Sequence, residues 1–93
     1  MTFWVYILAS GRNGTLYIGQ TDELSRRIWE HKQKLTPGFT SKYGVDQLVW
    51  MAEFPTRDEV KSRERQIKAW KRAWKLDLIE KDNPDWKDLY WDL

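Results

Sequence analysis

The chain has 93 residues, a formal net charge of +2, no cysteine, and seven Trp, four Tyr and three Phe. This length suits one domain, residues 1–93, and the absence of thiols excludes disulfide bonds and thiolate-bound zinc. The sequence contains neither a signal peptide nor an apolar run long enough for a membrane span, so we expect a cytoplasmic domain with an aromatic-rich core and no membrane partner.

Two short runs rich in β-forming residues open the chain, at residues 3–9 and 15–19. The segment between them contains Asn13-Gly14, a pair typical of tight hairpin turns. We therefore predict an antiparallel β-hairpin at the N-terminus.

A helix is predicted after this hairpin. Thr21 or Asp22 can cap its start, with Glu23 in the first turn, and Pro37-Gly38 can end it. Its apolar side, at helical spacing, would consist of Leu24, Ile28, His31 and Leu35.

The second half of the chain predicts one strand and two helices. The strand covers residues 47–54, and Thr56 with Glu59 forms a capping box that begins the next helix. Leu78-Ile79 indicates a further helical turn before Asn83-Pro84. The order β-β-α-β-α-α is typical of an α+β fold, here a small three-stranded antiparallel sheet flanked by helices. The apolar side of the longer helix would carry Val60, Ile67, Trp70 and Trp74.

Charge is unevenly distributed along the second half. Residues 57–75 contain eight Lys or Arg against three Asp or Glu, whereas residues 76–93 contain six acids against two bases. A basic segment of this kind fits a surface that binds a polyanion. It also fits an ordinary solvated helix face, which is the commoner arrangement.

Three polar residues fall on or beside apolar helical stripes. His31 shares a face with Ile28, Arg27 lies one turn before His31, and Glu64 borders the stripe of the later helix. A carboxylate in such a place must pair, bind a metal or face a cleft, because burying an unpaired charge is costly. A structural explanation also exists for four residues. His31 can be a hydrogen-bonded core histidine, and Glu64 can pair with Lys61 or Lys68. The hairpin tyrosines Tyr6 and Tyr17 can pack across the two strands.

Five motifs, in order along almost the whole chain, resemble the GIY-YIG nuclease family. They are Val5-Tyr6-Ile7, Tyr17-Ile18-Gly19, the first-helix segment 24–31 with Arg27 and His31, the later helix segment 63–68 with Glu64, and Asn83-Pro84-Asp85-Trp86. Each motif alone is a weak signal, and the five in register are strong. The resemblance implies a GIY-YIG endonuclease-like fold for the whole chain.

The segment 39–44 and the short Trp-containing end are similar to the small stand-alone branch of that family. Val5 stands where the naming triplet has Gly, a position that contributes backbone and no reacting group. The resemblance implies a metal-dependent endonuclease that hydrolyses DNA phosphodiester bonds. Relatives of this fold act in excision repair, on DNA structures and in homing, so structure-specific cleavage linked to DNA repair or recombination is implied. The branch lacks the extra DNA-binding domains of larger relatives, which leaves the choice of substrate open.

The resemblance also implies catalytic roles. Tyr17 would activate the attacking water as general base, and because an unperturbed tyrosine has a pKa of about 10, it needs nearby positive charge. Arg27 would supply this charge and contact the scissile phosphate. Tyr6 would orient the water or phosphate, and His31 would contact phosphate or relay a proton. Glu64 would bind one Mg²⁺ or Mn²⁺ ion, which commonly keeps several waters and uses one or two carboxylates.

The remaining expectations concern the surroundings of this site. Gly19 would allow a close approach of the backbone, and Asn83 would tie the C-terminal tail to the site by hydrogen bonds. The mechanism requires the catalytic groups to converge on one water-accessible hollow. Contacts to the DNA backbone, which are sequence-independent and salt-sensitive, are expected from Gly19, Lys42, Lys61, Arg65, Lys68 and Lys71.

Other functions stay open at this point. The chain can be a nucleic-acid-binding module that kept the fold and lost catalysis, because fold and function are separable. It can also be a protein-interaction domain that uses exposed Trp86 and Trp91 as anchors, although packing of both onto the sheet is favoured. RNA stays possible as a substrate, and a monomer is favoured over an oligomer.

Overall fold

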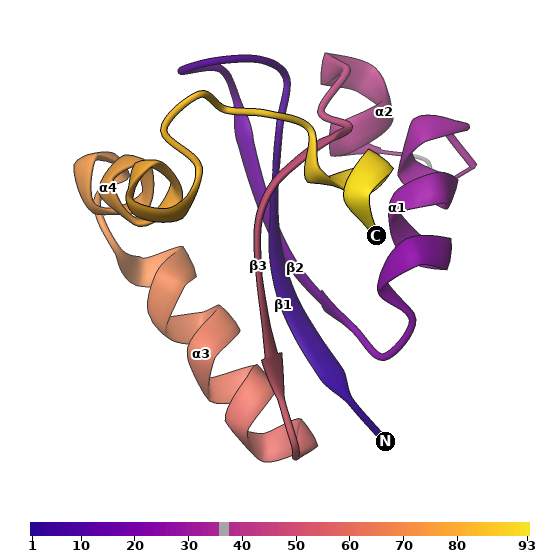
Figure 1. The fold of residues 1–93 in the computed structure, drawn as a ribbon, viewed down its shortest axis with the longest axis vertical. Helices are drawn as coiled ribbons and strands as arrows, with labels where there is room; N and C mark the ends of the chain where they lie inside the picture. Colours follow the sequence, from indigo (N-terminus) through magenta and orange to yellow (C-terminus); the bar gives the residue numbers. More distant parts are fainter. Residues whose placement is uncertain (36–37) are drawn as a thin grey trace.

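The computed structural model describes residues 1–35 and 38–93. Its elements, in chain order, are β1 (Phe3–Ala9), β2 (Leu16–Thr21), α1 (Leu24–Lys32), α2 (Phe39–Tyr43), β3 (Gln47–Phe54), α3 (Arg57–Ala69), α4 (Arg72–Asp82) and the 3-10 helix η1 (Leu89–Asp92) (Figure 1). The predicted α+β class, with a three-stranded antiparallel sheet flanked by helices, is confirmed. The helices α2 and η1 are additional to the prediction.

The central strand of the sheet is β1. It pairs antiparallel with β2 on one side and with β3 on the other, so β2 and β3 are the two edge strands. In the hairpin, Tyr6 lies opposite Gly19 and Leu8 lies opposite Tyr17. Since alternate residues of a strand point to opposite faces, this register places both hairpin tyrosines on the same face of the sheet.

The two faces of the sheet are covered by different helices (Figure 1). On one face, Val5 and Ile7 pack in a cluster with Val60 and Ile67 of α3 and Ile79 of α4. This cluster is apolar, and its burial supplies much of the hydrophobic stabilisation.

On the other face of the sheet, a second cluster packs against α1. Tyr6 and Leu8 of β1 contact Leu24 and Ile28 of α1 and Val45, which follows α2. This face therefore mixes apolar packing with a phenol hydroxyl, a polar group that needs a hydrogen-bond partner when it is buried.

The turn of the hairpin is held by a residue from far along the chain. Asn13 has φ 57°, but Gly14 does not have a positive φ, so this is not the two-residue Asn-Gly turn. The Ser10 N–H bonds to the Thr15 carbonyl across a longer loop. The Arg72 guanidinium donates hydrogen bonds to the carbonyls of Asn13 (2.8 Å) and Gly14 (2.7 Å). The outer end of the hairpin is thereby attached to the start of α4.

Helix α1 differs from the prediction at both ends. Its N-cap is Glu23, which makes no side-chain cap hydrogen bond, and the Thr21 hydroxyl instead accepts from the Glu23 N–H at 3.0 Å. At the C-terminal end, Lys34 has φ 57°, and the N–H groups of Lys34 and Leu35 bond to the carbonyls of His31 and Glu30. This is the Schellman arrangement that ends helices.

Leu35 therefore does not belong to the apolar side of α1. It lies beyond the helix and is 60% exposed, because the left-handed residue Lys34 turns the chain away from the sheet. The predicted stop at Pro37-Gly38 comes after the real end of the helix, and Pro37 lies outside the described residues.

The predicted apolar stripe of the longer helix extends over two helices in the structure. The capping box is confirmed at its N-terminal half, where the Thr56 hydroxyl accepts from the Glu59 N–H. Val60 and Ile67 are buried as predicted, but α3 ends at Ala69 and Trp70 has an extended backbone. Trp74 consequently belongs to α4 and is 50% exposed, so its placement on the stripe of α3 was wrong.

The C-terminal tail crosses from the α4 side to the α1 side along β3 (Figure 1). The register of β1 with β3 shifts between Ile7 and Leu8, which leaves Val49 as a bulge residue. The Asn83 amide donates to the Val49 carbonyl at 3.1 Å, and the Asp88 carboxylate accepts from the Leu48 N–H at 3.0 Å. The tail thus satisfies the outward backbone groups of this edge strand.

No helix in residues 1–35 and 38–93 is long and apolar enough to cross a membrane.

Candidate active site at the β2 edge

Three rings converge where the hairpin faces α1. The ring centroids of Tyr6 and Tyr17 lie 6.3 Å apart, those of Tyr6 and His31 6.0 Å, and those of Tyr17 and His31 5.6 Å. The Tyr6 hydroxyl is 3.2 Å from Nε2 of His31, within hydrogen-bond distance. Tyr6 and His31 are almost fully buried, whereas Tyr17 is half-buried. Tyr17 is therefore the member of this cluster that solvent reaches most readily.

Gly19 makes room for this arrangement. A Cβ atom built on Gly19 would lie 2.5 Å from the Tyr6 hydroxyl oxygen, 2.6 Å from Tyr6 Cζ and 3.0 Å from a ring carbon of Tyr17. Distances this short are not tolerated between nonbonded atoms, so any side chain at this position displaces the Tyr6 ring. The close approach at Gly19 in the structure is to the phenol of the neighbouring strand, and the expected contact of Gly19 with DNA stays a prediction.

Arg27 lies beside the rings on α1. Its side chain is 35% exposed and is 3.5 Å from the Glu30 carboxylate. Its guanidinium interacts with the Tyr6 hydroxyl, which raises the pKa of Arg27. The residue lines a pocket of about 320 Å³ together with Thr21, Asp22, Glu23, Arg26 and Glu30.

The protonation of the buried groups follows from their surroundings. Burial raises the pKa of Tyr6 to about 12, although the neighbouring Arg27 guanidinium acts in the opposite direction. The negative charges that Tyr17 and Glu64 can carry add to the increase. Burial lowers the pKa of His31, and the charge of Arg27 lowers it further. Tyr6 and His31 are therefore both neutral at pH 7.

His31 has a second hydrogen-bond partner that the sequence did not indicate. Its Nδ1 lies 3.1 Å from the hydroxyl of Thr40 in α2, and this hydroxyl is buried. Segment 39–44 is similar to the small stand-alone branch, but nothing in it indicates a role for Thr40, because α2 is a helix of only five residues. Both ring nitrogens of His31 are thus engaged.

Glu64 approaches β2 from the other face of the sheet. Its carboxylate accepts from the side-chain amide of Gln20 at 3.0 Å and lies 3.3 Å from the Lys68 ammonium. It lines a pocket of about 400 Å³ with Gln20, Lys61, Arg65 and Lys68. The pairing with Lys68 is the one that helical spacing allowed.

The two pockets flank the same end of the edge strand. Gln20 lines the pocket of Glu64 and its neighbour Thr21 lines the pocket of Arg27. The structure thus brings Tyr6, Tyr17, His31 and Arg27 together, and it places Glu64 in a separate pocket around the edge of β2. One pocket shared by all the catalytic candidates is not observed among residues 1–35 and 38–93.

The residues around Glu64 fit a hard divalent cation in their donor chemistry. Within the described part of the chain, no three His, Asp or Glu side chains are grouped to hold a metal. A single carboxylate suffices for Mg²⁺ or Mn²⁺ when phosphate and water complete the shell. Gln20 holds the Glu64 carboxylate by its amide N–H, and the exposed Lys68 can release the carboxylate without disturbing the core.

The predicted DNA contacts divide into two groups. Lys61, Arg65 and Lys68 are exposed on α3 and surround Glu64. Lys42 lies on α2, with its ammonium 5.4 Å from the Tyr43 ring centroid, and Lys71 lies 4.9 Å from the Trp74 ring centroid. Only the α3 group belongs to the pocket of Glu64.

Asn83 does not tie the tail to this site. Its amide donates to the carbonyls of Val49 and Lys87, and its carbonyl accepts from the Lys87 N–H at 3.0 Å. Because β3 is the edge strand opposite β2, these bonds hold the far edge of the sheet. The prediction that linked Asn83 to the site was wrong, since the bulge residue Val49 is what its amide satisfies.

The two tail tryptophans behave differently. Trp86 is 4% exposed, packs in the cluster below α3 and α4, and donates its indole N–H to Glu80 at 2.8 Å. Trp91 is 74% exposed. The packing that was favoured for both residues therefore holds for Trp86 alone.

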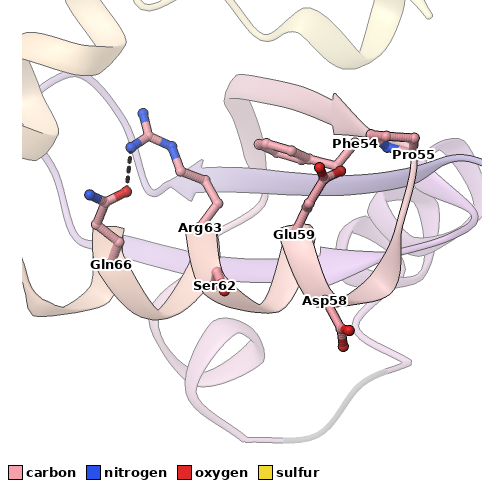
Figure 2. Close-up of a pocket in the computed structure, with 7 residues that line it drawn as sticks. All are labelled: Phe54, Pro55, Asp58, Glu59, Ser62, Arg63 and Gln66. Atoms are coloured by element: carbon pink, nitrogen blue, oxygen red, sulfur yellow. Dashed lines mark hydrogen bonds between the residues drawn. The ribbon is translucent and has the colours of Figure 1, made fainter.

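A broader pocket lies on the side of α3 that faces away from β2. It measures about 770 Å³ and is lined by Phe54, Pro55, Asp58, Glu59, Ser62, Arg63 and Gln66. Figure 2 shows Arg63 and Gln66 projecting from α3 and joined by a hydrogen bond of 2.6 Å. None of the predicted catalytic or DNA-binding residues lines this pocket, so its size does not identify it as the active site.

Comparisons with known proteins identify relatives of this chain. Residues 2–77 match the family model described as "GIY-YIG catalytic domain". A UPF0213 protein of Staphylococcus saprophyticus is 33% identical over 76 residues, which are 82% of this chain and 92% of that protein. A UPF0213 protein of Syntrophus aciditrophicus is 37% identical over 83 residues, covering 88% and 93%.

A solved structure is also similar. The solution NMR structure of the UPF0213 protein BH0048 from Bacillus halodurans superimposes with a TM-score of 0.59 and 28% sequence identity, covering 95% of this chain and 93% of that one. The similarity therefore extends over the whole sheet and the helices on both of its faces.

Proposed function

We propose that this chain, which belongs to the GIY-YIG family, is a divalent-metal-dependent endonuclease that hydrolyses DNA phosphodiester bonds and acts as one domain, residues 1–93. The observation that carries the proposal is the meeting of Tyr6, Tyr17, His31 and Arg27 between the hairpin and α1, with Glu64 on the other side of β2. Phosphodiester hydrolysis needs an activated water, relief of negative charge and stabilisation of the leaving oxygen, and this set of groups provides for each.

Arg27 is the group suited to hold the phosphate. A guanidinium is always charged and presents a planar set of donors that matches phosphate oxygens. Arg27 is partly exposed on the site side of α1. Its charge also favours loss of a proton from a phenol nearby.

The two tyrosines would have different roles toward the attacking water. Tyr17 is half-buried and therefore reaches water, and we assign it the role of general base. Tyr6 keeps its proton because burial raises its pKa to about 12, so it acts as a hydrogen-bond donor that orients the water or phosphate. His31 supports Tyr6 through its Nε2.

Glu64 is the residue that would hold the metal. When bound there, one Mg²⁺ or Mn²⁺ ion would neutralise charge on the phosphate and the leaving oxygen. Gln20 holds the carboxylate from β2. Lys68 would exchange its contact with Glu64 for one with the DNA backbone.

The basic face of α3 would bind DNA without reading its sequence. Lys61, Arg65 and Lys68 offer three exposed charges beside Glu64, and phosphate contacts position a nucleic acid but carry no base information. Choice of substrate would then depend on DNA shape. This supports a structure-specific activity, with DNA repair or recombination as its setting.

The test compares several substrates with two variants. The purified protein is incubated with plasmid, single-stranded, flap and branched DNA, and with RNA, in Mg²⁺ or Mn²⁺. Glu64→Ala should lose cleavage, and Glu59→Ala, an exposed carboxylate on the same helix, should retain it. Chelator should abolish the parent activity. Cleavage that resists chelator, or that persists in Glu64→Ala, would contradict the mechanism.

A second candidate is a nucleic-acid-binding module without catalysis. The observation that favours it is the engagement of both Glu64 carboxylate oxygens, by Gln20 and Lys68. Salt-sensitive binding to DNA by the parent, with no cleavage of any substrate in either metal, would select this candidate.

A further inference from the structure

Thr40, His31 and Tyr6 form a buried chain of hydrogen-bonding groups from three elements. The Thr40 hydroxyl lies 3.1 Å from Nδ1 of His31, and the Tyr6 hydroxyl lies 3.2 Å from Nε2. The exposed fractions are 6% for Thr40, 2% for His31 and 1% for Tyr6. Because all three side chains are buried, each of these hydroxyl and ring nitrogen atoms needs a hydrogen-bond partner.

A neutral imidazole carries one N–H, so only two arrangements satisfy both bonds. In the first, Thr40 donates to Nδ1 and His31 donates from Nε2 to the Tyr6 oxygen. In the second, His31 donates from Nδ1 to Thr40 and Tyr6 donates to Nε2. The two differ in which hydroxyl hydrogen is left for another acceptor.

The surroundings of the two hydroxyls favour the first arrangement. In residues 1–35 and 38–93, the hydrogen-bond partner described for the buried Thr40 hydroxyl is Nδ1 of His31. The Tyr6 hydroxyl instead lies against Gly19 and beside Arg27. In the first arrangement the Tyr6 hydrogen is therefore left free beside Arg27.

We propose that Thr40 is a positioning residue that fixes His31 in the Nε2–H tautomer, so that His31 donates to the Tyr6 oxygen and the Tyr6 hydrogen is presented to the substrate. The role of the Tyr6 hydrogen rests on the proposed nuclease function. The tautomer itself does not, since it is a property of the protein without substrate.

The tautomer of His31 decides whether the Tyr6 hydroxyl can donate a hydrogen bond to the substrate. When His31 donates to the Tyr6 oxygen, the hydrogen of Tyr6 itself is left for the attacking water or a phosphate oxygen. In the other tautomer, that hydrogen is occupied by Nε2 of His31. Thr40 would therefore control whether Tyr6 can act as a donor, without touching the substrate.

The tautomer can be measured directly, because His31 is the only histidine of the chain. Long-range ¹H–¹⁵N NMR spectra at pH 8 should show a protonated Nε2 and an unprotonated Nδ1 in the parent. Thr40→Val, which keeps the shape and removes the hydroxyl, should shift the population toward the Nδ1–H tautomer. Thr40→Ser should restore the parent pattern, and Ser41→Ala, on the same helix, should not change it.

Cleavage rates provide the second measurement. Thr40→Val should lower kcat about 10- to 100-fold, the usual effect of losing a partner that orients a functional histidine, with KM unchanged. Thr40→Ser should stay within about threefold of the parent by the same reasoning. Dispersed amide spectra check that the variants fold, and Thr40→Ala serves as a second variant if Thr40→Val does not.

Two results would overturn the proposal: an Nδ1–H tautomer in the parent, or a Thr40→Val variant with the parent's tautomer and rate. If the parent cleaves no nucleic acid, the nuclease function fails, while the NMR measurement still decides the role of Thr40.

Discussion

The two edge strands of the sheet are used in opposite ways. Along β2, partly exposed polar side chains gather from both faces, with Tyr17 and Arg27 on one side and Glu64 on the other. Along β3, the tail residues Asn83 and Asp88 bond to the outward backbone groups of Val49 and Leu48. One edge presents side chains for chemistry and the other is closed by the chain's own end.

This difference separates two kinds of polar group that look alike in the sequence. Asn83 and His31 are both buried, and both belong to motifs that resemble the same family. Asn83 satisfies backbone at the closed edge, whereas His31 contacts a catalytic candidate at the other. The edge to which a residue belongs therefore predicts whether its loss affects stability or activity.

The largest effect is expected at Arg27. Arg27→Ala should reduce cleavage at least about 100-fold, because it removes the charge that stabilises the phosphate in the transition state. Arg26→Ala removes the same charge one residue earlier, from a side chain that is 72% exposed, and should stay within a few-fold of the parent by the weak effect of exposed charges. Equal rates for the two variants, measured on the same DNA, would show that Arg27 does not contact the reacting phosphate.

Tyr17 is the other residue of the β2 edge whose loss should affect activity, and Tyr17→Phe tests this. It should reduce cleavage by a similar factor, about 100-fold, because general-base catalysis typically contributes this much. Its free energy of unfolding should stay near that of the parent, since the ring and its packing are kept. A variant that cleaves at the parent rate would remove Tyr17 from the reaction.

Gly19→Ala should reduce both the free energy of unfolding and the cleavage activity. The new Cβ would meet the Tyr6 hydroxyl oxygen at 2.5 Å, and overpacking of this kind costs about 1–3 kcal/mol. Displacement of Tyr6 should also abolish cleavage. Gly11→Ala is the matched control, because a Cβ there meets nothing within 4 Å. Urea unfolding and a cleavage assay report the two effects, and a fully active, stable Gly19→Ala would contradict the packing described.

Asn83→Ala should affect stability alone. It leaves the Val49 carbonyl without its partner and removes both bonds to Lys87, a loss of about 2 kcal/mol. For a domain of this size the melting temperature should fall by about 10 °C. Asp85→Ala, an exposed residue of the same turn, serves as control. Loss of cleavage by fully folded Asn83→Ala would place this residue at the active site after all.

The smallest effect is a pH dependence of stability. Burial lowers the pKa of His31 below its ordinary 6.5, so the unfolded chain binds a proton more readily than the folded one. The contribution of His31 to the free energy of unfolding is therefore complete above pH 6.5 and is lost as the pH falls below it. Arg27 and Glu30 face His31 and act on its pKa in opposite directions.

Replacement of the imidazole isolates this contribution. The difference in unfolding free energy between the parent and His31→Gln should decrease from pH 7 to pH 5, because Gln does not titrate. A difference that stays constant over this range would mean that His31 does not stay neutral in the folded protein.

Much of the fold could be predicted from local pattern. The N-terminal hairpin and the Thr56 cap are encoded by a few adjacent residues, and the structure contains both. The ends of the helices were less predictable. Lys34 has a left-handed conformation after α1, which its residue type does not predict. Helix α3 ends at Ala69 without Gly or Pro.

For the candidate site, the sequence predicted which residues take part but not the contacts that hold them. The family motifs identified the tyrosines, Arg27, His31 and Glu64, but not how they are supported. Thr40 and Gln20 act through contacts between elements that are 9 and 44 residues apart in the chain. Partners of this kind depend on tertiary packing, which no local pattern encodes.

The attachment of Arg72 to the hairpin turn has a mechanical consequence. Because one guanidinium bonds to two successive carbonyls of the turn, the turn cannot lift away unless the first turn of α4 releases it. The loop and the helix should therefore behave as one cooperative unit in amide hydrogen exchange, although 58 residues separate Gly14 from Arg72. A nick or an insertion in the turn would therefore loosen the start of α4 as well as the hairpin.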